Sequence, residues 1–267
     1  MLKLLWCEFA KLRRKPLFFA AAAVSALIPL GCALFLPDFQ EFTSGAEAVD
    51  GMMSTLFQMS AYLLLMPALV VLASNLLFEE QDNDTLKSLM TVPVSKPALA
   101  MAKMALLFLF SIAFMAVGGL VILVIVLAAG WEPVGFWRLF FVGIGQGIMM
   151  WAGALPCILL VVLLNRSYII SVIITFFYTA VNYIFGLNDL FITQPFGLNL
   201  GTLLPGPLTF RWYFQYLDFS NAGTEMLGLL ERVSPYFVTT AQAFLVTGVE
   251  AAVFLALIAL VYKRQGV

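Results

Sequence analysis

The sequence contains no histidine, which removes the side chain that most often serves as a general base or metal ligand near neutral pH. Charged residues are also scarce: they make up 11% of the 267 residues, whereas a soluble domain carries about a quarter. The three cysteines, Cys7, Cys32 and Cys157, are widely separated, so their spacing indicates neither a disulfide framework nor a zinc site. The formal net charge of −1 provides no general attraction to nucleic acid. The composition is therefore atypical of metal-dependent enzymes, disulfide-rich domains and nucleic-acid-binding proteins.

Hydrophobic residues dominate instead and make up 63% of the chain. They gather in six runs of 19 to 27 residues, and an α-helix needs about 20 apolar residues to cross the hydrocarbon layer of a membrane. The sequence therefore predicts an all-α polytopic membrane protein with a single transmembrane domain. The six predicted spans are residues 17–36, 54–78, 104–129, 139–164, 168–186 and 236–262.

The basic residues indicate the orientation of these spans, because cytoplasmic flanks are enriched in Lys and Arg. With both termini in the cytoplasm, eleven of the 14 basic residues fall on the cytoplasmic side. The three that then lie outside are Arg138, Arg211 and Arg232. We therefore expect both termini to be cytoplasmic.

Residues 1–15 predict an amphipathic helix. Leu2, Trp6 and Phe9 recur at helical spacing, and most of the charged residues fall on the opposite side. Such a helix is suited to lie in the headgroup layer of the membrane. A basic signal peptide is the alternative, but the apolar run that follows is longer than a typical signal core.

Residues 187–235 lie on the outer side in this topology and are unusually apolar for a loop. The sequence Pro-Gly-Pro at 205–207 interrupts the segment, and Thr224 can cap a short helix through Leu230. Ser234-Pro235 is a start signal for the last span. The segment predicts short helices half inserted into the outer leaflet, which is tolerated where they pack on protein. A small cap in water is the alternative.

Residues 79–103 form the longest charged segment on the predicted cytoplasmic side. Asp84 or Thr85 can cap a helix, and Pro93 ends it. A second helix, with a proline in its first turn, continues through Lys103 into the third span. The first helix is amphipathic and needs lipid or a partner protein to cover its apolar face. The residues of that face are Leu86, Leu89 and Met90.

Three polar residues inside predicted spans are candidates for a translocation pathway or a subunit interface. Glu250 lies near the middle of the last span, where a charged group costs about 2.5 to 3.5 kcal/mol on insertion scales, so it should face protein or water. The other two are Asn182 and Gln146, and either can instead be a structural hydrogen-bond partner of Glu250. Gln146 belongs to the run G-I-G-Q-G at 143–147, which predicts close helix packing.

The motif E-E-x-x-x-x-T-L-K-x-L-x-x-x-P-V-S-K at 79–96 resembles the same region of ABC-2 type permeases, the membrane subunits of one class of ATP-binding-cassette exporter. The amphipathic start, the six spans and the half-inserted outer segment extend this resemblance over nearly the whole chain. The length and the opening MLKLLWCEFAKLRRK resemble most closely the subunits that confer lantibiotic immunity or bacitracin resistance. The resemblance implies a type V exporter-like fold in a bacterial cytoplasmic membrane.

The resemblance also implies a mechanism with partners. Two permease subunits, identical or related, would form the pathway for a hydrophobic or peptide substrate, and two copies of an ATP-binding subunit would bind the coupling helix at 84–91. ATP and Mg²⁺ would be held by that partner, because this chain has no G-x-x-x-x-G-K-[ST] loop, and the chain itself would bind no cofactor. The residues expected to contact the ATPase are Glu79, Glu80, Asp82, Asp84, Thr85, Leu86, Lys87, Leu89 and Met90.

We therefore expect a transporter subunit that removes antimicrobial peptides of the lantibiotic or bacitracin-like kind from the membrane. The alternatives are an exporter of another drug, a lipid or an ion, and a non-transporting membrane sensor or scaffold coupled to an ATPase. An intramembrane enzyme is disfavoured, since the sequence offers no histidine, no metal cluster and no nucleophile–base pair.

Overall fold

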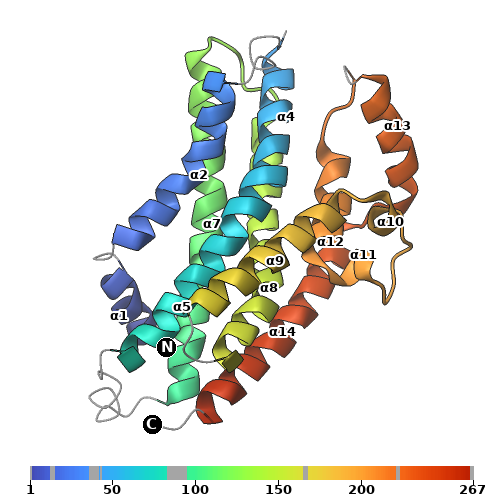
Figure 1. Ribbon diagram of the computed structural model, residues 1–267. Coiled ribbons are helices and arrows are strands. Elements are labelled where there is room, and N and C mark those ends of the chain that lie inside the picture. The colour runs from blue at the N-terminus through green and yellow to red at the C-terminus, as the bar shows by residue number, and fades with distance from the viewer. Residues whose placement is uncertain are drawn as a thin grey trace.

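The structure is a computed structural model that describes residues 2–12, 16–35, 42, 44–82, 95–164, 168–220 and 223–264. All regular elements within these ranges are helices, as the sequence predicts (Figure 1). The long helices form a bundle, and the short helices of the predicted outer segment gather at one side of it. In chain order the elements are α1 (Leu2–Leu12), α2 (Pro16–Phe35), α4 (Gly45–Thr55), η1 (Leu56–Leu65), α5 (Met66–Asp82), α7 (Lys96–Ala128), α8 (Phe136–Leu164), α9 (Tyr168–Gly186), α10 (Asp189–Ile192), α11 (Leu200–Leu203), α12 (Pro205–Tyr213), η2 (Phe214–Tyr216), α13 (Thr224–Val233), η3 (Ser234–Tyr236) and α14 (Thr240–Arg264).

Four helical stretches in the described residues are long and apolar enough to cross a membrane. Two shorter apolar helices lie within the first and fifth predicted spans. The polytopic helical architecture is thus confirmed, while the count of six spans stays a prediction. The four long stretches are Gly45–Leu77, Lys96–Ala128, Phe136–Leu164 and Thr240–Lys263, and the two shorter ones are Phe19–Phe35 and Val172–Gly186.

The helix of the second predicted span begins at Gly45, nine residues earlier than the sequence suggested. Ser44 caps it, because its side chain accepts a hydrogen bond from the Glu47 backbone N–H at 3.3 Å. Ala48 and Val49 are buried, so packing supports helix formation in a stretch that reads as polar. At about 1.5 Å per residue the 33-residue helix is about 50 Å long, which exceeds the hydrocarbon thickness.

The middle of this helix, η1, is π-helical over ten residues. Its Phe57, Ala61 and Leu65 are buried, and it packs against α7, α8, α9 and α12. π-Helical turns are rare and occur frequently at functional sites. The stretch lies where the outer segment enters the bundle.

Close packing at the glycine-rich run of α8 is confirmed. A Cβ atom on Gly147 would lie 2.9 Å from the Ser111 carbonyl oxygen of α7. A Cβ atom on Gly145 would lie 2.7 Å from the Trp212 ring of α12. The glycines therefore let α8 approach two neighbours at once.

The third predicted span is part of a longer helix, α7, which begins after Ser95 and has Pro97 in its first turn. It continues through Lys103 to Ala128, as the pattern of residues 95–103 predicted. Residues 96–103 and the third predicted span are therefore parts of one continuous helix.

The last span starts later than Ser234-Pro235, which instead forms the 3-10 turn η3. Thr239 and Gln242 form a reciprocal cap: the Thr239 N–H donates to Gln242 Oε1 at 3.0 Å, and the Gln242 N–H donates to Thr239 Oγ1 at 3.3 Å. The short helix α13 forms as predicted, but its N-cap is Gly223, and it extends to Val233.

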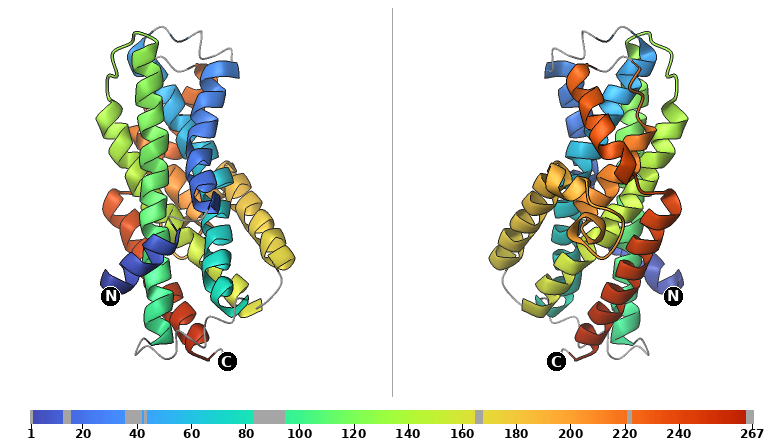
Figure 2. Two further views of the ribbon diagram at one scale, coloured as in Figure 1. Left: turned by 90° about the vertical axis from the view of Figure 1, so that its left-hand side faces the viewer. Right: turned by 90° about the vertical axis from the view of Figure 1, so that its right-hand side faces the viewer.

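Helix α1 crosses α7 obliquely near the end of the bundle that holds the C-terminus (Figure 2). Trp6 and Phe9 are 72% and 40% exposed, and their rings stack 6.1 Å apart. Glu8 is buried and bonded to Lys11 at 2.8 Å. The predicted apolar face is thus open, as an interfacial helix requires.

Candidate functional site

The predicted ATPase-coupling segment, residues 79–103, includes the end of α5 at Asp82 and the start of α7 at Lys96. Both ends lie at the end of the bundle that holds the C-terminus (Figures 1 and 2). The backbone of Glu79, Glu80 and Asp82 belongs to the last turns of α5. The predicted helix 84–91 lies outside the described residues and stays a prediction, as do its expected contacts. Those outside the described residues are Asp84, Thr85, Leu86, Lys87, Leu89 and Met90.

Lys103 is a residue whose position sequence reasoning did not foresee. Its side chain is fully buried, and Nζ donates to the Leu76 backbone carbonyl near the end of α5. Lys103 therefore fastens α5 to α7 at the base of the segment that would carry the ATPase contacts. The signal in the sequence was a single lysine within an otherwise apolar run.

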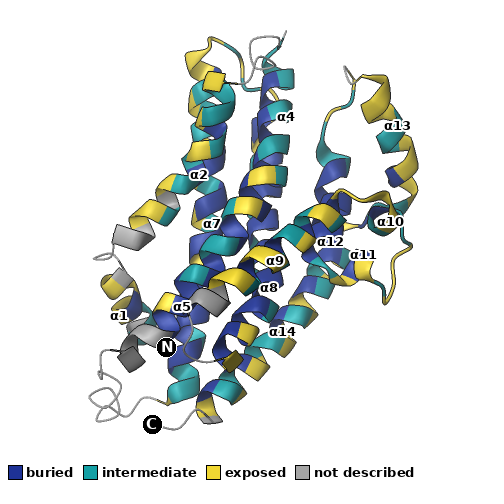
Figure 3. Cartoon of the chain, in the orientation of Figure 1, coloured by how far each residue is buried: buried dark blue, intermediate teal, exposed yellow. Residues whose placement is uncertain are grey.

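The outer segment enters the bundle through α12. All nine residues of α12 are buried, and the helix packs against α8, α9, α14 and η1 (Figure 3). The Pro-Gly-Pro sequence begins this helix rather than interrupting the segment, because proline suits the first helical turn. A Cβ atom on Gly206 would overlap the Asn182 backbone carbonyl of α9. Packing of the outer segment on protein, the condition for half insertion, is therefore met at α12.

A chain of hydrogen bonds joins α12 to the π-helical stretch and to α9. The Tyr62 hydroxyl donates to the Gly206 carbonyl at 3.0 Å and contacts the Thr209 hydroxyl. The Gly206 N–H donates to Asn182 Oδ1 at 3.3 Å. The Tyr178 hydroxyl donates to the Gly153 carbonyl of α8 at 2.6 Å. Buried polar groups in a membrane helix bundle require such partners, so the network holds α12 in place.

The three candidate pathway residues do not form one cluster of hydrogen bonds. Gln146 is fully buried and donates to the Phe57 backbone carbonyl at 2.8 Å. Asn182 is fully buried in the α12 network. Glu250 is half-buried on α14, and within the described residues its carboxylate makes no hydrogen bond, although it acts electrostatically on Tyr178. The structural alternative, a bond from Glu250 to either amide, is therefore not realised, and the pathway role of all three stays a prediction.

Arg211, counted from the sequence as an outer basic residue, is buried inside the outer segment. Its Nε donates to the Tyr236 carbonyl at 2.8 Å, and Nη1 donates to the Gly201 carbonyl at 3.0 Å. These bonds join α12 to α11 and to the turn before the last span. Arg211 is therefore a buried residue that joins these elements, and it is not a free surface charge.

These features define a helical membrane protein in which the short helix α12 packs into the bundle. The sequence model of the ABC-2 family transporter proteins matches residues 4–182, which run from α1 into α9. The chain therefore belongs to the ABC-2 transporter family and is a permease subunit, the membrane component of an ABC transporter, a class that generally works with a separate ATP-binding subunit. A search of curated proteins gives no match.

Proposed function

We propose that this permease subunit removes amphipathic antimicrobial peptides from the membrane, driven by an ATPase bound to residues 79–96. The proposal rests chiefly on the surface of the outer segment. Leu190 on α10, Leu198 before α11 and Met226 on α13 are 68%, 96% and 42% exposed. In the orientation inferred from the basic residues, this apolar surface meets a peptide lying in the outer leaflet.

Transport would then follow from a shift between two packings of the bundle. ATP binding would favour one arrangement of the ATPase pair, and the coupling helices would transmit that preference to α5 and α7. Lys103 joins these two helices near the base of the coupling segment, so they would move together. Glu250 on α14 is the group proposed to line the pathway or to face the second permease subunit.

The experiment that tests this function is the peptide susceptibility of cells that express the chain with its ATP-binding partner subunit. Minimum inhibitory concentrations of nisin and bacitracin are compared with those of cells carrying a catalytically inactive ATPase. Protection that disappears with the inactive ATPase is the expected result. No protection, with both proteins present and associated, would exclude peptide export and favour a small drug, lipid or ion as the substrate.

A second experiment addresses the coupling helix. Leu86→Asp together with Leu89→Asp is expected to abolish co-purification of the ATPase. The matched control is Ser88→Asp with Thr91→Asp, which places the same two charges on the opposite face of the predicted helix. Equal recovery of the ATPase with both double variants would contradict the assignment of the apolar face.

A further inference from the structure

A cavity of about 370 Å³ lies between the first turns of α4 and the segment from η2 to α13. The predicted topology assigns both segments to the outer side of the membrane. The Asp218 backbone N–H donates to Asp50 Oδ2 at 2.8 Å and so joins the two segments at the cavity. The volume falls in the usual range for ligand pockets, about 300 to 1,000 Å³.

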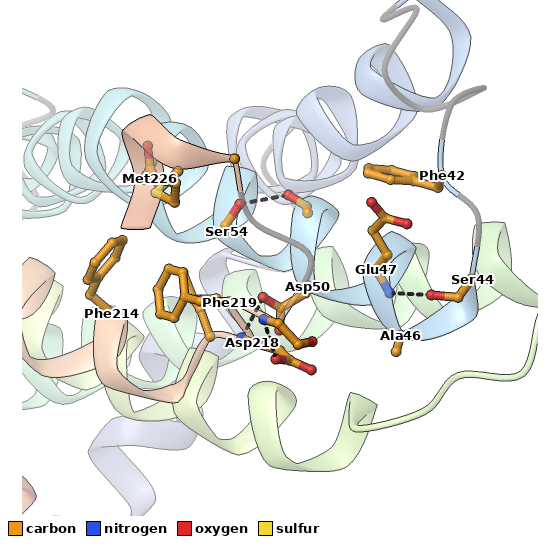
Figure 4. A pocket seen from close by; sticks show the side chains of 15 residues that line it. Phe42, Ser44, Ala46, Glu47, Asp50, Ser54, Phe214, Asp218, Phe219 and Met226 are labelled. Atoms are coloured by element: carbon orange, nitrogen blue, oxygen red, sulfur yellow. Dashed lines mark hydrogen bonds between the residues drawn. The ribbon is translucent and has the colours of Figure 1, made fainter. Parts of the chain in front are cut away.

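The lining of this cavity combines aromatic and acidic side chains. Figure 4 shows Phe42 on one side, Phe214 and Phe219 on the other, and the carboxylates of Asp50 and Asp218 between them. Glu47 adds a third carboxylate, and Met226 adds a flexible apolar wall. No Lys or Arg lines the cavity in the part of the chain that the structure describes.

A local hydrogen bond stabilises the negative charge of the Asp218 carboxylate. The Ser220 backbone N–H donates to Asp218 Oδ1 at 3.0 Å and holds the pKa of this carboxyl below its ordinary range, so the carboxylate is ionised at neutral pH. Arg138, which is not part of the lining, acts in the same direction on the pKa of Asp218. The described lining therefore carries three carboxylates and no Lys or Arg.

We propose that this cavity is the outer recognition site for a basic side chain and its apolar neighbours on an amphipathic peptide. The carboxylates would pair with the cation, and the phenylalanine rings would contact the apolar groups or the cation itself. A cavity of this size holds one or two side chains rather than a whole peptide. The inference rests on the proposed function and specifies which part of the substrate the permease contacts first.

The test uses the permease with its ATPase partner in nanodiscs and two probes. Tetraphenylphosphonium, a compact apolar cation, tests the chemistry of the cavity, with neutral triphenylphosphine oxide as its comparison. Fluorescently labelled nisin tests the peptide, with lysine-acetylated nisin as its comparison. The cavity variant is Asp50→Asn with Asp218→Asn, because asparagine at position 50 keeps an oxygen that can accept the hydrogen bond from residue 218.

The expected result is that the cavity variant binds tetraphenylphosphonium and nisin about tenfold more weakly, because it loses one partly buried and one exposed ionic partner. It should bind both comparison probes as the unmodified protein does. The control variant is Glu132→Gln with Glu225→Gln and Glu231→Gln. It removes three exposed carboxylates outside the cavity and should retain full affinity.

Equal affinity of the unmodified protein and the cavity variant for nisin would overturn the inference, even if cells remain protected in the susceptibility test, so the proposed function would survive. Equal loss in the control variant would also overturn it, because a general surface charge would then explain binding. Charge-dependent nisin binding without ATP-dependent protection would support the cavity and count against the proposed function.

Discussion

Replacing Tyr62 by phenylalanine tests the hydrogen bonds that hold α12 in the bundle. The change removes the hydroxyl that donates to the Gly206 carbonyl at 3.0 Å and contacts Thr209, while the ring keeps its buried position. The Thr209 hydroxyl still donates to the Pro205 carbonyl at 2.5 Å. The Gly206 carbonyl is therefore the single buried acceptor that loses its strongest donor. We expect a loss of about 1 kcal/mol, since hydrogen bonds between membrane helices contribute about 0.6 to 2 kcal/mol.

Thermal unfolding of the purified protein, followed by tryptophan fluorescence, measures this change. A loss of about 1 kcal/mol lowers Tm by about 2–4 °C for a chain of this size. The matched control is Ser60→Ala on the same π-helical stretch. The Ser60 hydroxyl is fully buried and has no hydrogen-bond partner among the described residues, so its removal should leave Tm unchanged or raise it. An unchanged Tm for Tyr62→Phe, or an equal fall for both variants, would refute the role of the network.

Three further substitutions test other parts of the structure. Gly206→Val forces a side chain against the Asn182 carbonyl and should destabilise the protein by about 1–3 kcal/mol or prevent folding. The yield and Tm of this variant are compared with those of Gly228→Val, whose site on α13 is open. Lys103→Ala should lower Tm and weaken the stimulation of the ATPase by the permease, because the hydrogen bond between α7 and α5 is lost. Unchanged ATPase activity at equal permease content would exclude a role of Lys103 in coupling. Thr239→Ala removes the reciprocal cap of α14 and should cost about 1 kcal/mol, measured as Tm; an unchanged Tm would show that the cap is redundant.

The sequence predicts the helical membrane architecture well, because long apolar runs reflect the cost of placing polar groups in lipid. Local signals were also sufficient for the start of α7 at Lys96, with Pro97 in its first turn, and for the close packing at Gly147, since each depends on the properties of one residue type. The early start of α4 and the late start of α14 were not predicted. Burial of Ala48 and Val49 supports the early start of α4. Helix α14 begins after the cap at Thr239, which follows the more obvious start signal of Ser234-Pro235.

The contacts that build the candidate sites could not be predicted from local patterns. Asp50 and Asp218 are 168 residues apart, and Tyr62 reaches Gly206 across 144. From the sequence alone, Arg211 is interpreted as an ordinary charge on the outer side. In the structure its guanidinium donates to two backbone carbonyls. Each of these contacts depends on how α12 enters the bundle, which is a property of the whole fold.

The measurement that tests the central claim most directly is the amount of labelled nisin bound to the membranes of cells that express the permease with its ATPase. The account predicts that membrane-bound nisin falls while ATP is available, that it stays high with an inactive ATPase, and that it stays high with Leu86→Asp plus Leu89→Asp. Equal amounts of bound nisin in all of these cells, with the proteins present in the membrane, would contradict ATP-driven removal of peptides by this chain.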